Sequence, residues 1–311
     1  MGLSYEEKAS HFDSLSRVFV RKDSPEITSV GVAPESVTLD LSTVNVKELR
    51  SQFLAQQKNF DTAPFDHNGA LFRLYPGQVT AWSGYPGAGK TTLLRQFVCH
   101  LLQAGRSVFV ASLEEHPRDF LWRTICTAAG AREPNDHQAQ WFLDQHGERL
   151  RIWSVIGASA ADDVLSAINA LKPSHAVIDS LMALDISGYD WEAQRLFSKK
   201  LLGAARMSGA HIHLVAHPRK PAASDQMPDV HDIAGSADLG RLVDNALFVR
   251  RNSGEESVSG PSGMQILVRK QRHFTGGCPV FSGYFHREFL QFHTERFPSR
   301  AARYLPEDAY T

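Results

Sequence analysis

The segment Gly84–Thr91 holds the residues of this chain that are best suited to chemistry. It reads Gly-Tyr-Pro-Gly-Ala-Gly-Lys-Thr, the pattern of a loop that wraps backbone N–H groups around the phosphates of a nucleotide. The pattern predicts that Lys90 reaches the β- and γ-phosphates and that the Thr91 hydroxyl binds Mg²⁺. We therefore expect ATP and Mg²⁺ as cofactors. The residues predicted to contact the nucleotide here are Gly84, Tyr85, Pro86, Gly87, Ala88, Gly89, Lys90, Thr91 and Thr92.

Two acidic residues downstream follow apolar runs and could complete a site for phosphoryl transfer. Asp179 ends the run Ala176–Ile178, and a carboxylate in that place is typical of a Mg²⁺ ligand. Glu114 follows the run Val108–Ala111 and is our candidate for the base that orients the attacking water. From chain order, we expect its strand to lie beside the strand that leads into the loop. Solvated loop positions for Glu114 and Glu115, or a helix-capping role for Glu115, remain open.

A histidine ends a third apolar run. His217 follows Ile212–Ala216, and an imidazole at that strand end could contact the γ-phosphate and report its loss. His211 and His213 belong to the same run and are expected to be packing residues. No spacing of His, Cys and Asp predicts a metal site other than the Mg²⁺ site at Thr91 and Asp179.

A scaffold in which strand ends converge is needed to bring these side chains together, and the hydrophobic pattern predicts one. Strands and helices alternate from Leu74 onward, which favours a parallel sheet covered on both faces. After Asp244 the pattern changes to successive strands, which predicts an antiparallel extension. The expected strands are 78–83, 107–112, 150–155, 175–180, 211–216, 245–250, 263–270, 280–285 and 289–293, and the expected helices are 90–103, 117–129, 160–171 and 191–207.

The two ends of the chain are patterned differently from its centre. Residues 1–60 are expected to form an arm, with an amphipathic helix at 44–54 that packs on its own core or on a neighbouring subunit. Residues 61–293 are expected to form the nucleotide-binding domain, and 294–311 a mobile C-terminal tail.

Composition sets broad bounds on the function. The net charge of −1 does not by itself predict a nucleic-acid partner, so any DNA-binding cations must be concentrated locally. The three cysteines are far apart in the sequence, which argues against a zinc ribbon or a disulfide framework. No apolar run is long enough to span a membrane, and Met1–Lys8 lacks the apolar core of a signal peptide. We expect a cytoplasmic protein that is not secreted.

Six segments, taken in order, resemble the DnaB-type replicative DNA helicases, in particular their phage and Twinkle-like branch, without a primase domain. The resemblance covers roughly residues 45–293. It implies a RecA-like P-loop ATPase core of the α/β class, working as a ring that is usually a hexamer, with nucleotide bound between subunits. The segments are Gly84–Thr91, Ser112–Glu115, Val177–Ser180, His213–Lys220, Asp232–Ser236 and Lys270–Arg272.

The resemblance also implies roles for individual residues. Glu114 would be the catalytic base and His217 the γ-phosphate sensor. Lys270 and Arg272 would reach the nucleotide of the neighbouring subunit, with Arg272 as an arginine finger that stabilises charge on the phosphoryl oxygens. Phe285 would stack on the base. Lys270 and Arg272 could instead be exposed charges on a strand, and Phe285 could be a core residue.

The segment Pro218–Ser236 resembles the family's DNA-binding loop in the central channel. Arg219 and Lys220 begin it and are the predicted DNA contacts, since cations on flexible backbone track phosphates without reading sequence. A plain surface loop is the alternative. Many relatives carry a basic residue where this chain has Ala234, which removes one expected phosphate contact.

Together these features predict an ATP-hydrolysing ring that translocates on single-stranded DNA and unwinds duplex DNA in replication. The resemblance implies 5′-to-3′ movement and priming by a separate primase, with a polymerase as a further partner. A RecA-like recombinase that forms a filament on DNA is one alternative. A regulatory scaffold ATPase, with slow hydrolysis that does not respond to DNA, is another.

Overall fold

The computed structural model describes residues 44–153, 161–186, 190–218, 229–233, 237–251, 261–274, 276–296 and 298–310. The chain divides into two compact units, Met1–Ala33 and Pro34–Thr311. The first unit lies outside the described residues, as do most of the predicted arm and the predicted DNA contacts Arg219 and Lys220.

A nine-stranded sheet in the order β3-β2-β4-β5-β1-β6-β7-β8-β9 forms the centre of the second unit. Strands β1 to β6 run parallel to one another, and β7 to β9 continue the sheet in antiparallel fashion from β6. The strands are β1 (Val79–Ser83), β2 (Val108–Ser112), β3 (Leu150–Trp153), β4 (His175–Asp179), β5 (His211–Val215), β6 (Asn245–Arg251), β7 (Ser262–Gln271), β8 (Val280–His286) and β9 (Gln291–His293).

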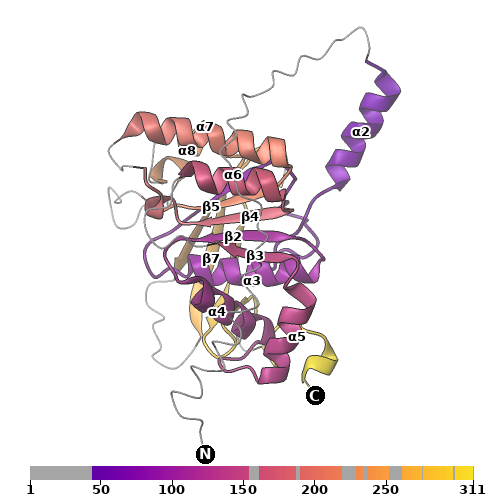
Figure 1. Cartoon of the computed structure of the whole chain (residues 1–311), viewed down its shortest axis with the longest axis vertical. Helices are drawn as coiled ribbons and strands as arrows, with labels where there is room; N and C mark the ends of the chain where they lie inside the picture. Colours follow the sequence, from indigo (N-terminus) through magenta and orange to yellow (C-terminus); the bar gives the residue numbers. More distant parts are fainter. Residues whose placement is uncertain are drawn as a thin grey trace, which may run out of the picture. The chain divides into compact units, whose positions relative to one another are not determined.

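Helices cover both faces of the sheet (Figure 1). Two hydrophobic clusters correspond to the two faces, one built on α3, α4 and α5 and the other on α6, α7 and α8. Every residue of β1, β2, β4 and β5 is buried, as expected for parallel strands with helices on both sides. No helix in the described part of the chain is long and apolar enough to cross a membrane. The helices are α3 (Lys90–Gln103), α4 (Pro117–Ala129), α5 (Asp136–His146), α6 (Ala161–Leu171), α7 (Trp191–Ser208) and α8 (Ala237–Leu242).

The predicted fold class is confirmed: a mainly parallel sheet between helices with a C-terminal antiparallel extension. One expectation about strand order was wrong. Strand β2, which ends before Glu114, does not lie beside β1 but is separated from it by β4 and β5. Chain order cannot give this arrangement, because crossover connections place each strand through contacts that are distant in sequence. Helix α5 was not predicted, although Asn135 and Gln138 form a capping box at its start.

Helix α2 (Val46–Lys58) begins after Asn45, whose side chain accepts hydrogen bonds from two backbone N–H groups of the first turn. None of its side chains is buried. Val46 is 75% exposed and Phe53 57% exposed. Within the described residues, α2 therefore does not pack on the core of its own chain, and packing on a neighbouring subunit stays a prediction.

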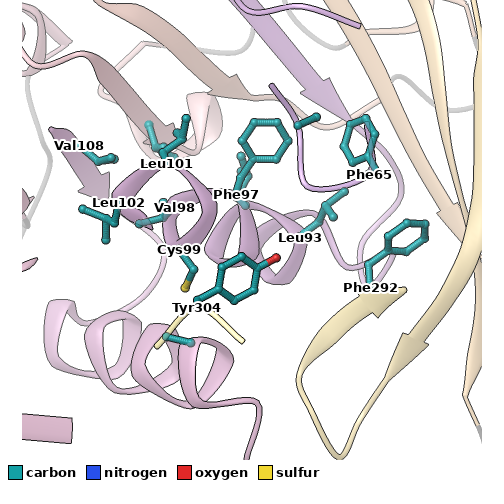
Figure 2. Packing of buried hydrophobic residues seen from close by; sticks show 14 of the residues in the cluster. Phe65, Leu93, Phe97, Val98, Cys99, Leu101, Leu102, Val108, Phe292 and Tyr304 are labelled. Atoms are coloured by element: carbon teal, nitrogen blue, oxygen red, sulfur yellow. The ribbon is translucent and has the colours of Figure 1, made fainter. Parts of the chain in front are cut away.

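The C-terminal segment packs on the core, contrary to the expected mobile tail. The side chains of Tyr304 and Leu305 are buried, and Figure 2 shows the Tyr304 ring beneath Cys99 of α3. Gln96 of α3 fixes this arrangement, since its Nε2 donates to the Tyr304 hydroxyl (3.0 Å) and to the Phe292 carbonyl (3.0 Å). The segment therefore completes the cluster on the α3 face of the sheet.

Candidate nucleotide-binding site

The predicted P-loop connects β1 to α3 at the carboxyl end of the parallel strands. Two of its glycines are required by geometry. Gly84 has φ +151°, and a Cβ there would lie 2.3 Å from the Val249 carbonyl oxygen. Gly89 has φ +96° and immediately precedes α3, so a side chain there would strain the entry to the helix. The loop thus points the first N–H groups of α3 toward the position of a phosphate.

Lys90 lies inside this loop. Its Nζ donates to the carbonyl oxygens of Gly84 (2.7 Å) and Tyr85 (3.2 Å). Burial lowers the pKa of Lys90, and the negative charges of Asp179 and Glu114 oppose that shift. The ammonium group is therefore held by neutral backbone acceptors, which a charged phosphate oxygen can replace.

Thr91 and Asp179 meet as a metal site requires. The Thr91 hydroxyl donates to Asp179 Oδ2 at 2.8 Å. The other carboxylate oxygen, Oδ1, is buried without a hydrogen-bond partner. Burial raises the pKa of Asp179 to about 6, and the negative charge of Glu114 adds to this shift. A hydroxyl beside an incompletely satisfied carboxylate oxygen fits the hard oxygen ligation of Mg²⁺.

Glu114 faces this site from the end of β2. One of its oxygens, Oε1, accepts a hydrogen bond from the Ser180 hydroxyl and lies 3.6 Å from His217 Nε2. The Nδ1 atom of His217 is buried without a hydrogen-bond partner. The three strand ends predicted to carry chemistry, those of β2, β4 and β5, therefore converge, as parallel neighbours in the sheet must.

A cavity of about 360 Å³ unites these groups. The predictions missed two of its residues, the apolar Val215 at the end of β5 and Arg251, which ends β6 and adds a guanidinium to the lining. No motif marks Arg251, although its place at the end of the strand paired with β1 would have pointed to it. The cavity is lined by Pro86, Gly87, Gly89, Lys90, Thr91, Thr92, Glu114, Asp179, Val215, His217 and Arg251.

Glu115 has a different role from Glu114. It pairs with the buried Arg95 and lies 3.3 Å from Arg123 Nε, and the cap of α4 is His116. Glu115 is thus neither the helix cap nor a solvated loop charge. Of the two adjacent carboxylates, only Glu114 lines the cavity.

Lys270 and Arg272 lie at the opposite end of the sheet, because β7 runs antiparallel to β6 and its end pairs with the beginning of β6. Lys270 Nζ donates to the carbonyls of Gly240 and Arg241. Arg272 donates to the Arg241 carbonyl (2.8 Å) and to Asp244 Oδ1 (3.4 Å). Neither cation lines the cavity of its own chain.

The remaining predicted contacts are Phe285, for the base, and Arg219 and Lys220, for DNA phosphates. Phe285 is partly buried against the core cluster and is not among the residues that line the cavity. Arg219 and Lys220 lie outside the described residues. The described ends of their segment lie together, since Pro218 and Ile233 form an isolated antiparallel bridge beside the end of β5.

Comparison with known proteins agrees with this geometry. A family model described as an AAA domain matches residues 48–223, more than half of the chain. The chain is 27% identical to the chloroplastic and mitochondrial Twinkle homolog protein of Arabidopsis thaliana over 67% of its own length and 32% of that protein's. It is 28% identical to the DNA repair protein RadA of Mycobacterium tuberculosis over 60% of its length and 35% of that protein's. The chain thus spans about a third of the curated relatives it matches.

Solved structures share the fold. One of them, an isolated ATPase domain, matches with a TM-score of 0.66 and 17% identity, over 79% of this chain and 96% of that one. A DnaB-like replicative helicase, studied for its interactions with primase, matches with a TM-score of 0.59 and 17% identity, over 70% of this chain and 58% of that one. The chain therefore belongs to the AAA-domain family and has the RecA-like fold of DnaB-like helicase ATPase domains, as the order of its motifs predicted.

Proposed function

We propose that the protein is an ATP hydrolase that assembles into a ring, translocates 5′ to 3′ on single-stranded DNA and unwinds duplex DNA in replication. One observation carries the proposal: the P-loop, Asp179, Glu114 and His217 line a single cavity. Phosphoryl transfer to water needs these kinds of group together. The similarity to the Twinkle homolog and to a DnaB-like replicative helicase supports the choice of a DNA motor.

The ring is proposed to be a hexamer, with the nucleotide bound between neighbouring subunits. The location of Lys270 and Arg272 at the far end of the sheet supports this arrangement, because neither residue lines the cavity of its own chain. A guanidinium supplied by a neighbour makes hydrolysis depend on assembly. Arg219 and Lys220 are proposed to contact DNA phosphates.

Each group in the cavity has a role that follows from its surroundings. Lys90 exchanges its backbone acceptors for phosphate oxygens, and Glu114, held by Ser180, accepts a hydrogen bond from the attacking water. We assign contact with the γ-phosphate to His217, and its location in the same cavity beside Glu114 supports this role. Thr91 and Asp179 would hold Mg²⁺, which neutralises charge on the phosphates when bound.

Unwinding of a forked DNA duplex tests the proposal. Duplexes with a free 5′ tail or a free 3′ tail are incubated with ATP and the protein, beside a Lys90→Ala variant. We expect unwinding only with the 5′ tail, and none with the variant. ATP hydrolysis without unwinding of either fork would contradict the helicase proposal.

A second candidate is a RecA-like ATPase that holds single-stranded DNA in a filament without unwinding it. The similarity to the DNA repair protein RadA favours this alternative. Electron microscopy of the protein on single-stranded DNA with a slowly hydrolysed ATP analogue separates the two. Closed rings support the helicase, and open filaments support the RadA-like alternative.

A further inference from the structure

A chain of hydrogen-bonded polar side chains runs across strands β4, β5 and β1 on the face of the sheet that α3 covers. Asp61 Oδ2 lies 3.0 Å from His175 Nε2, and His175 Nδ1 lies 3.1 Å from His213 Nε2. The indole N–H of Trp82 donates to His213 Nδ1 at 3.1 Å. We call these four residues the Asp61 relay. His175, His213 and Trp82 are each at most 1% exposed.

The direction of every hydrogen bond in the Asp61 relay is fixed by Trp82. An indole nitrogen can only donate, so His213 must accept at Nδ1 and carry its proton at Nε2. His175 must then accept at Nδ1 and donate from Nε2 to the Asp61 carboxylate. Both imidazoles are therefore neutral, and burial lowers the pKa of His213 well below its ordinary value.

The relay touches three strands, and each of these strands ends in a group of the nucleotide cavity. Trp82 is on β1, which leads into the P-loop. His175 begins β4, which ends in Asp179, and His213 is on β5, which leads to His217. The hydrogen bonds of the relay thus connect the three strands whose ends carry the P-loop, the proposed metal ligand Asp179 and the proposed sensor His217.

Helix α3 holds the relay against the sheet. The ring of Phe97 lies 5.1 Å from the ring of Trp82 and 5.5 Å from that of His213, measured between centroids. The same helix begins with Lys90, so the relay packs against the helix that follows the P-loop. His211 packs beside the relay, bonded to the Thr80 hydroxyl and the Tyr75 carbonyl.

At its other end the relay reaches the surface. Asp61 also accepts from Arg106 Nε at 2.7 Å. Burial would raise the pKa of Asp61, but the hydrogen bonds from His175 and Arg106 and the positive charge of Arg106 outweigh it and lower the pKa. Asp61 lines a second cavity, of about 230 Å³, and follows closely after the end of α2 at Lys58. The relay therefore begins three residues after the exposed helix α2 ends.

We propose that Asp61 is a positioning residue for the nucleotide site, acting through His175 and His213 on Trp82 and linking the segment after α2 to the P-loop. The proposal rests on the proposed ATP hydrolysis. Loss of the Asp61 carboxylate leaves His175 without its acceptor inside a buried network, where an unmade hydrogen bond is costly. The side-chain hydrogen bonds that connect β4, β5 and β1 are then weakened, although the backbone pairing of these strands remains.

Catalysis should suffer more than nucleotide binding. The P-loop itself, with its own glycines and Lys90, remains whole and continues to hold the phosphates. Alignment of the phosphates with Glu114 and His217 depends on neighbouring strands, and small misplacements of reacting groups slow a reaction strongly. A purely structural network would instead lower thermal stability and leave the turnover of the folded protein unchanged.

The test compares variants of the full chain well below their unfolding temperatures. For Asp61→Ala and His213→Leu we expect kcat for ATP to fall about tenfold, with KM and the Kd for a fluorescent ATP analogue changing less than about threefold. His213→Gln keeps one acceptor and one donor and should remain within about threefold of the wild-type kcat. Arg106→Ala removes the other partner of Asp61 and should change kcat less than about twofold. Wild-type turnover in both disrupted variants, or an equal loss in Arg106→Ala, would overturn the proposal.

Histidine ¹⁵N NMR of the wild-type chain provides a test that does not depend on turnover or on folded variants. We expect His175 and His213 to be neutral with the proton on Nε2, and both signals to shift when ADP and Mg²⁺ are added. Absence of the shift would overturn the relay even if ATP is hydrolysed. A shift without any ATP hydrolysis would support the relay and count against the proposed function alone.

Discussion

Asp179 and Glu114 lie at the ends of the neighbouring strands β4 and β2, yet their surroundings suit them to different chemistry. Asp179 is 5% exposed and bonded to Thr91, with one oxygen left unsatisfied. The side chain of Glu114 is 45% exposed and faces His217. A buried carboxylate beside a hydroxyl is suited to a metal ion, and a more accessible one is suited to a water molecule.

Glu114→Gln should abolish hydrolysis and preserve binding. We expect kcat to fall at least about a hundredfold, because the amide cannot serve as a base, while the Kd for ATP changes little. Steady-state hydrolysis and titration with a fluorescent ATP analogue measure the two effects. Glu115→Gln is the matched control: Glu115 pairs with Arg95 outside the cavity, so its loss should lower thermal stability with a smaller effect on kcat. Near-normal turnover by Glu114→Gln would exclude it as the base.

Asp179→Asn should increase the stability of the nucleotide-free protein and abolish its ATP hydrolysis. Burial raises the pKa of Asp179 from 3.8 to about 6, so the ionised side chain destabilises the nucleotide-free fold above pH 6. An amide removes this cost, and the variant should be more stable by up to about 3 kcal/mol at pH 7.5. Its Mg²⁺-dependent hydrolysis should be lost. Urea denaturation without nucleotide measures the first effect, and a less stable variant would show that the buried Asp179 carboxylate does not destabilise the fold.

At the scale of the elements, the end of β7 has two alternative roles, because Arg272 is suited both to an arginine finger and to a local ion pair with Asp244. Mixing two inactive variants decides between these roles. The Lys90→Ala variant retains the arginine finger but has a defective nucleotide site. The Arg272→Ala variant retains the nucleotide site but lacks the arginine finger. If Arg272 acts in trans, mixed assemblies should regain part of the wild-type hydrolysis rate. A local ion pair predicts that Arg272→Ala lowers stability and that mixing restores nothing.

The elements were easier to predict than their arrangement. The runs that lead to Asp179 and Glu114 were identified because buried parallel strands are continuously apolar. The position of β2 in the sheet was predicted wrongly, because long-range packing determines which strands are its neighbours. The Asp61 relay was also missed. His211 and His213 alternate along β5 and so share a face, but the partner Asp61 lies far away in the sequence.

At the scale of the whole molecule, buried neutral histidines should make the fold sensitive to acid. Burial lowers the pKa of His211 to about 3 and the pKa of His213 well below its ordinary value. It lowers the pKa of three others, His100, His146 and His293, to about 4. Below pH 6.5 the unfolded chain takes up protons that the folded chain does not, so stability falls as pH falls.

The expected loss is roughly 2 kcal/mol at pH 5 for each of the two fully buried histidines, relative to pH 7.5. The raised pKa of Asp179 acts in the opposite direction between pH 6 and 4 but is a single group. Urea denaturation from pH 7.5 to pH 5 measures the balance. His146→Gln should flatten the curve, while the exposed His137→Gln should not. Constant stability across this range would show that the buried histidines are not neutral in the fold.

We propose that the cavity at the end of the parallel strands hydrolyses ATP as part of a DNA motor. The most direct measurement is the rate of ATP hydrolysis with and without single-stranded DNA, beside Lys90→Ala. We expect Mg²⁺-dependent hydrolysis that rises at least about tenfold when DNA is added and disappears in the variant. A rate that does not respond to DNA, or that persists without Lys90, would contradict it.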